Sequence, residues 1–395
     1  MKQFLFTACI AACVTFTLYE LRIYFIAPFT DPLAERSVQH GDHWDYTGLI
    51  HFHTYCTGDA TGSYEELGKA ANRQHLDFMI STERNNLLAL REHREGWVGH
   101  TLFLVGAEMT RPEGYLLALN LVKFPFTRFT STEEVLQSIT EQQGLAFTAH
   151  PENPRFRWKM KDDPRILGIE IVDLTDQFNA ASALSKAAWI LDYPFNMPYA
   201  YLQMYNRPSD ALAKWDAVAS KRPYVGIFAP DFHQHANILG DLAIDFPRSE
   251  DMMPAGHDHI VINRALAGDL QEDKKEIYKA LRNGQLYVAM DSIRDATGFF
   301  FTAMQAGKTA WMGSTLAAGQ TTEFTVSLPP SDLAGATIIH VYCNGKEIHS
   351  VPAQASYKFK ATAVGAYRIE VDYNMPAFWG SREVPWVYSN PIYLN

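Results

Sequence analysis

The chain has 395 residues and a formal net charge of −10, and 47% of its residues are hydrophobic. This length exceeds what one ordinary hydrophobic core supports, so we expect two or three domains. The acidic balance argues against a surface that binds nucleic-acid phosphates. We therefore expect a small-molecule partner and no nucleic acid.

Residues 1–29 predict a membrane-targeting segment, because an uncharged apolar run occupies residues 4–19. Such a run is typical of an uncleaved transmembrane anchor, a cleaved signal peptide or, since residues 10–13 resemble a lipobox, a lipoprotein signal. All three readings place the body outside the cytoplasm, so we expect a membrane-anchored protein of the bacterial cell envelope. Residues 30–45 predict a polar linker in which His43 is solvated.

The next segment contains the first dense polar cluster, HFHTYCTGD at residues 51–59, at the end of an apolar run. In an extended strand alternate side chains share a face, so His51 and His53 point the same way. Two imidazoles do not hold a metal ion selectively, so further ligands must come from elsewhere in the chain.

Four later segments have one design in common, an apolar run that ends in a polar residue. These runs lead to Glu108, His150, Glu170 and the pair Asp231 and His233. Strand ends that converge on one rim are how barrel enzymes build their sites. We therefore expect these side chains to lie near the two histidines.

Helix signals alternate with these strands and predict an α/β domain over residues 46–296. Capping boxes at residues 63–66 and 131–134 start two helices, and further helices are expected at residues 209–220 and 272–283. The aromatic-rich stretch from Ala187 to Tyr205 is expected to pack between helices, with a pocket wall or a membrane-facing patch as the alternative.

Residues 297–395 change to short alternating strands and predict a separate β-sandwich. The Asn-Gly pair at residues 344–345 is a strong hairpin signal, and a two-residue loop there pairs His340 with His349. With no third ligand in view, we expect that pair to be exposed on the sheet and free of metal.

Other potential ligands are expected to stay uncoordinated. Cys56 and Cys343 fall in different predicted domains, so we expect buried free thiols, although the place of Cys56 inside the polar loop leaves a ligand role open. His257 and His259 follow a Pro-Ala-Gly turn and are expected to begin a strand.

The ordered series HFHT, ISTER, GAEMT, TAHP and PDFH resembles the PHP (polymerase and histidinol phosphatase) family of metal-dependent phosphoesterases over about residues 45–295. The resemblance implies a distorted (β/α)7 barrel that carries up to three metal ions. It assigns the first metal site to His51, His53, Glu108 and Asp231. It adds a second site that shares Glu108 and takes His150, and a third site with Asp59 and His233.

By the same resemblance Glu108, Asp231 and His150 are the catalytic residues, and the cofactor is one or two divalent ions of zinc, manganese or iron. The chain departs from the family in two places. Arg84 stands where a histidine ligand is expected, and Tyr115 occupies the place of another.

Arg84 cannot coordinate a metal, because a guanidinium stays protonated. It either replaces the third ion as a fork that holds a phosphate, or it pairs with Asp59 in a centre that has lost activity. Arg155 and Arg157 are predicted to meet an anionic substrate, with a solvated basic loop as the alternative.

The leading hypothesis is a membrane-tethered hydrolase of small phosphate esters that acts through a metal-bound hydroxide. The alternative is a non-catalytic cell-envelope binding protein that keeps one structural metal. A third possibility is hydrolysis of a different bond, such as an amide or a lactone.

Overall fold

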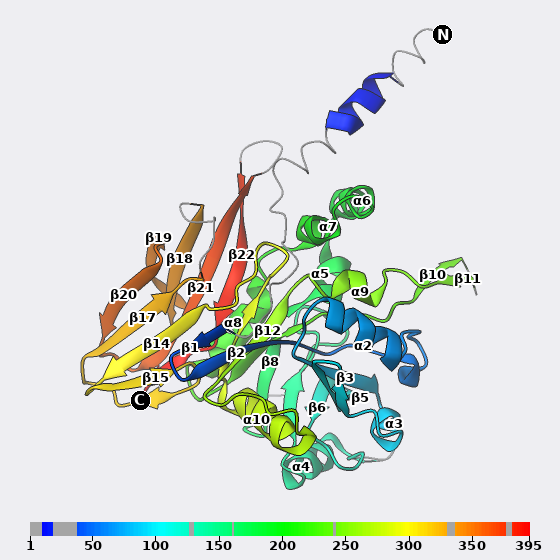
Figure 1. Ribbon diagram of the computed structural model, residues 1–395. Helices are drawn as coiled ribbons and strands as arrows, with labels where there is room; N and C mark the ends of the chain where they lie inside the picture. Colours follow the sequence, from blue (N-terminus) through cyan, green and yellow to red (C-terminus); the bar gives the residue numbers. More distant parts are fainter. Residues whose placement is uncertain are drawn as a thin grey trace.

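The computed structural model describes residues 10–18, 38–125, 130–159, 162–239, 242–329, 336–376 and 381–395 (Figure 1). Of the expected membrane segment, residues 10–18 are helical and the rest lies outside the described residues. No helix within the described ranges combines the length and the apolar character needed to cross a membrane.

A curved sheet of mostly parallel strands forms the body of the protein. Its parallel strands are β2 (His43–Ile50), β3 (Phe78–Arg84), β5 (Thr101–Arg111), β7 (Leu145–Thr148), β8 (Ile166–Asp173) and β9 (Val225–Ala229). Strand β6 (Gly114–Leu119), between β5 and β7, and strand β12 (His257–Ile262), beside β2, are antiparallel to these strands. The predicted α/β class is confirmed, and among the described strands these two antiparallel members distort the regular β/α repeat.

The sheet closes where the ends of β2 and β9 meet. The amide of Asp231 donates to the carbonyl of His51 at 2.9 Å, and the amide of His53 donates to the carbonyl of Phe232 at 3.1 Å. These bonds bring the polar residues after both strands to one rim, as the sequence predicted.

Helices cover the outside of this sheet (Figure 1). The bounds are α2 (Tyr64–Arg73), α3 (Leu88–Arg91), α4 (Thr132–Glu141), α5 (Leu174–Ala180), α6 (Ala183–Asp192), α7 (Met197–Met204), α8 (Ser209–Ala219), α9 (Ser249–Met252) and α10 (Leu270–Asn283). Both predicted capping boxes are present, at Ser63 with Glu66 and at Ser131 with Glu134. The four predicted helices are present as α2, α4, α8 and α10, and the capping boxes satisfy backbone donors at the starts of α2 and α4.

The two faces of β3 pack into two different apolar clusters. Phe78 and Ile80 of β3 join one apolar cluster, whereas Met79 joins the other. The same period of two carries the face of Ile80 on to Arg84, and that of Leu104 on β5 to Glu108. Because β3 and β5 pair Arg84 with Glu108, the strand register itself puts these two side chains together.

Residues beyond the barrel form two sheets. One contains β15 (Lys308–Trp311), β14 (Phe300–Gln305), β17 (Thr322–Ser327) and β20 (Ser356–Ala361). The other contains β16 (Thr315–Leu316), β18 (Thr337–Cys343), β19 (Lys346–Pro352), β21 (Gly365–Pro376), β22 (Ser381–Ser389) and β23 (Ile392–Leu394). Phe324 of the first sheet packs on Tyr367 of the second with ring centroids 4.9 Å apart.

The second sheet is continuous with the barrel, because β13 (Leu286–Ala289) pairs with both β12 and β22. Independence of the predicted domains 46–296 and 297–395 therefore stays a prediction. The remaining short elements are β1 (Val38–His40), β4 (Gly96–Val98), β10 (Ala236–Leu239), β11 (Leu242–Ile244) and the 3-10 turn η1 (Tyr55–Thr57).

Two local expectations are wrong. The hairpin at residues 344–345 forms, but a register shift beyond it pairs His340 with Ser350 and Val341 with His349, so the predicted histidine pair does not face across the strands. His43 is buried and stacks on Trp311 with centroids 3.8 Å apart, because β2 starts three residues earlier than expected.

Candidate metal centre

Strand ends at the barrel rim position the central ligands. His51 follows β2, Glu108 lies near the end of β5, and Asp231 follows β9. The backbone of His51 has φ 70°, that of His150 φ 51° and that of Asp231 φ 44°. Left-handed conformations cost non-glycine residues about 1–3 kcal/mol each and gather at functional sites, where they turn side chains out of the strand direction.

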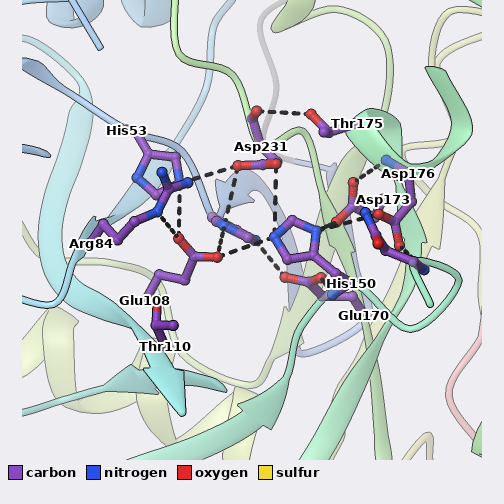
Figure 2. Close-up of polar contacts among 12 residues, drawn as sticks. His53, Arg84, Glu108, Thr110, His150, Glu170, Asp173, Thr175, Asp176 and Asp231 are labelled. Carbon is purple, nitrogen blue, oxygen red and sulfur yellow. Dashed lines mark hydrogen bonds and ion pairs between the residues drawn. The ribbon is translucent and has the colours of Figure 1, made fainter. Parts of the chain in front are cut away.

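Four predicted ligands converge on one point, and Figure 2 shows His53, Glu108 and Asp231 facing each other. Asp231 Oδ1 lies 3.3 Å from His51 Nε2 and 3.1 Å from His53 Nε2. The Glu108 oxygens lie 3.8 Å from His51 Nε2 and 3.6 Å from His53 Nε2. Ligands about 2.0–2.2 Å from a tetrahedral ion lie roughly 3.3–3.6 Å apart, so these separations suit a shared ion.

The polar atoms at this point are also unsatisfied. His51 Nε2, His53 Nε2 and Asp231 Oδ1 are buried, and within the described part of the chain none has a hydrogen-bond partner of normal geometry. Buried polar groups are costly without partners, so a cluster of such atoms calls for a cation. The residues present therefore fit the divalent ion that the sequence predicted, and they form groups that can hold one.

Glu170 orients the first histidine. His51 Nδ1 lies 2.5 Å from Glu170 Oε1, while the His150 amide donates to Glu170 Oε2 at 2.7 Å. Burial opposes a charge on His51, but Glu170 and Asp231 raise the pKa of its ring to about 9. Burial lowers the pKa of His53 to about 4, so that ring is neutral and its Nε2 lone pair is available.

Two carboxylates that the sequence did not single out hold His150. Its Nδ1 lies 2.7 Å from Asp173 and 3.5 Å from Asp176, and its Nε2 lies 3.1 Å from Glu108 Oε1 (Figure 2). Asp173 is also the N-cap of α5, accepting from the Asp176 amide. An Asp at the junction of a strand and a helix was the available signal, and carboxylates that orient a ligand histidine are common around metals.

Arg84 contacts both residues that were predicted to hold the third ion. Its NH1 pairs with Asp59, its Nε lies 3.0 Å from Glu108 Oε2, and its NH2 lies 3.1 Å from His233 Nε2. The two predicted third-site ligands thus meet a guanidinium. Both readings of Arg84 remain open on this geometry, because its side chain is paired and yet 29% exposed.

The other predicted residues lie around or away from this centre. The ring of Tyr115 lies edge-on to that of His150 with centroids 5.7 Å apart. Arg155 is exposed over the ring of Phe156, and Arg157 is exposed and lies 3.8 Å from Asp210. The interactions described for these two arginines do not reach the metal cluster, so their role as substrate contacts stays a prediction.

A second buried group of potential ligands lies at the junction with the C-terminal sheets. His257 Nδ1 and His259 Nε2 approach the same Asp291 oxygen at 2.5 and 2.9 Å, and His259 Nδ1 lies 3.2 Å from Asp45. The shorter separations are those of hydrogen bonds. Burial opposes a charge on His259, but Asp291 and Asp45 raise the pKa of its ring to about 10. The ring is therefore charged beside two carboxylates, and we interpret this group as an ion-pair network.

The fold and the site define a mixed α/β protein with a buried histidine and carboxylate centre suited to a divalent ion. No family model matches the chain, and no curated protein matches it. Among solved structures, it is similar to a two-domain protein from Bacteroides vulgatus that is described as containing a predicted PHP-like metal-dependent phosphoesterase. That similarity covers 92% of this chain and 99% of the other, at 12% identity and a TM-score of 0.41. We base the proposal that follows on the geometry of the site.

Proposed function

We propose that this protein is a PHP-like metal-dependent hydrolase of small phosphate esters. The observation that carries the proposal is the set of three buried, unsatisfied ligand atoms on His51, His53 and Asp231 beside a partly exposed guanidinium. A divalent ion and an arginine fork are the two cations with which proteins most often neutralise a transferring phosphoryl group.

The residues of the centre have separate roles in the proposed reaction. His51, His53, Glu108 and Asp231 would hold the ion, which when bound supplies Lewis-acid activation of a phosphoryl oxygen and of water. Glu170 fixes the tautomer of His51. Arg84, which contacts Glu108 and is 29% exposed, would hold a phosphate oxygen. His150 and Glu108 can add a second ion, so we expect one or two ions of zinc, manganese or iron.

Metal analysis combined with an esterase assay tests this function. The full chain is purified, its metals are quantified, and phosphate mono- and diesters are assayed before chelation, after chelation and after each metal is restored. We expect hydrolysis that chelation abolishes and one metal restores, and an Asp231→Asn variant that loses both metal and activity. His349→Ala, an exposed histidine on β19, is the matched control. Hydrolysis that survives complete metal removal would contradict the proposal.

The non-catalytic alternative has one observation in its favour, the pairing of Arg84 with both Asp59 and Glu108. In that case the metal is structural. The full chain then binds an ion that stabilises it against heat, but it hydrolyses no phosphate ester with any metal.

We also propose that the N-terminal segment tethers the protein to a membrane of the bacterial cell envelope. The supporting observation is that residues Ile10, Val14 and Leu18 of the N-terminal helix are 48–62% exposed. The test is fractionation of cells that express the full chain or a chain lacking residues 1–29. We expect the full chain in membranes and the shortened chain in the soluble fraction, and equal distribution of the two would refute the tether.

A further inference from the structure

A cavity of about 540 Å³ adjoins the metal centre. At one end it is lined by Asp59, Asp231 and His233, which belong to the centre. The rest of its wall is largely apolar, with Phe178, Trp189, Tyr201, Met204, Phe246 and Met252. Ligand pockets typically measure about 300–1,000 Å³, so this space has the size of a binding site and exceeds a packing defect.

The apolar wall is a packed aromatic cluster. Trp189 of α6 contacts Phe178 and Phe246 with ring centroids 5.6 Å apart in both cases, and it contacts Tyr201 of α7 at 6.3 Å. Trp189 is 5% exposed and Tyr201 is 4% exposed. Because the rings support each other, the wall keeps its shape without a ligand.

Two polar atoms of this wall have no hydrogen-bond partner among the residues that the structure describes. They are Trp189 Nε1 and the Tyr201 hydroxyl, which are buried in residues that line the cavity. Burial raises the pKa of Tyr201 well above its ordinary value, so its hydroxyl keeps its proton. Because these two atoms are closed off from solvent, the Trp189 and Tyr201 rings present apolar surface to the cavity.

We propose that the substrate is the phosphate ester of an apolar alcohol, whose alkyl or aryl group fills this cavity while its phosphate lies on the metal centre and Arg84. This inference rests on the proposed function, and it adds the substrate class. A sugar or a nucleoside fits poorly, because its many hydroxyl and amide groups would be buried against an aromatic wall without partners.

Phosphonates test this class without depending on turnover, because they are not hydrolysed. Binding of methylphosphonate and hexylphosphonate to the metal-loaded full chain is measured by titration calorimetry. We expect hexylphosphonate to bind at least about 30-fold more tightly, since each buried methylene contributes a favourable transfer term. Equal affinity of the two ligands, or no binding of hexylphosphonate, would overturn the inference.

Two exposed phenylalanines provide matched variants. Phe178 lines the cavity and is 38% exposed, whereas Phe195 is 49% exposed and is not among the residues that line it. We expect Phe178→Ala to remove most of the preference for hexylphosphonate and Phe195→Ala to leave it unchanged. Tyr201→Phe, which keeps the ring, should leave the alkyl preference intact. Identical behaviour of the two alanine variants would refute the assignment of the cavity.

The outcomes separate this inference from the proposed function. If methyl and hexyl phosphate are hydrolysed with equal kcat/KM, the function stands and the substrate class is wrong. If hexylphosphonate is preferred but no ester is hydrolysed, the cavity binds apolar phosphates and the hydrolase proposal is wrong.

Discussion

Replacement of Arg84 by alanine is the perturbation that most sharply tests how the centre works. The Arg84 guanidinium touches Asp59, Glu108 and His233, and its side chain is 29% exposed. If this cation takes over the work of a third ion, its loss removes a charge that acts on the transition state. Removal of one such donor costs about 2–4 kcal/mol, so we expect kcat/KM for phosphate esters to fall roughly 30- to 1,000-fold.

Metal content is the second readout for the same variant. Loss of a positive charge 3.0 Å from Glu108 makes the centre more attractive to a cation, so the metal content of Arg84→Ala should equal or exceed that of the wild type. Arg84→Lys keeps the charge but loses the planar fork, so we expect an intermediate rate. Arg84→His supplies an imidazole beside Asp59 and His233 and should raise the number of bound ions.

The control for these variants is Arg94→Ala, because Arg94 is 42% exposed and pairs with Glu92 at the surface. It should have wild-type activity and metal content. Wild-type turnover in Arg84→Ala would show that Arg84 does not replace an ion. Loss of metal in Arg84→Ala would show that it supports the ligands instead of the substrate.

Three further predictions address the ligands and the fold. Glu170 and Asp231 raise the pKa of His51 to about 9 against the effect of burial, so a proton must leave this ring when an ion binds. Metal affinity, measured by chelator competition, should therefore weaken up to about tenfold per pH unit as the pH falls from 9 to 6. A pH-independent affinity would contradict this prediction. Glu170→Gln should reduce metal affinity about 10- to 100-fold in the same assay, whereas unchanged affinity would show that the 2.5 Å contact with His51 is dispensable. The Arg368 side chain is 1% exposed and donates two 2.8 Å hydrogen bonds to Asp216. Arg368→Ala leaves that carboxylate without both bonds, so it should lower the free energy of unfolding by about 3–5 kcal/mol in urea titrations. An unchanged unfolding midpoint would refute this prediction.

The ligands were predictable because each belongs to a local pattern. An apolar run that ends in a polar residue marks a buried strand that reaches a rim, and the structure brings His51, His53, Glu108 and Asp231 together there. Arg84 was singled out by the resemblance, because it stands where a histidine ligand is expected. What the sequence lacked was the strand register that pairs Arg84 with Glu108.

The site residues that the sequence did not predict make contacts between elements that are distant in the chain. Asp173 and Asp176 meet His150 only because β8 lies beside β7, and no spacing along the chain indicates that contact. The stretch from Ala187 to Tyr205 was expected mainly to pack between helices. It does pack, but one side of Trp189 and Tyr201 also lines the cavity, and only the arrangement of α5, α6 and α7 decides which side is open.

Arg84 also changes how the centre depends on metal supply. An ion held by Asp59 and His233 would leave when the metal is scarce or when acid protonates its ligands. A guanidinium stays charged and cannot be removed by a chelator. The contact of Arg84 with Glu108 places this charge 3.0 Å from a carboxylate that the proposal makes a ligand of the first site. If Arg84 takes over the work of a third ion, we expect activity to saturate at one or two bound ions per chain.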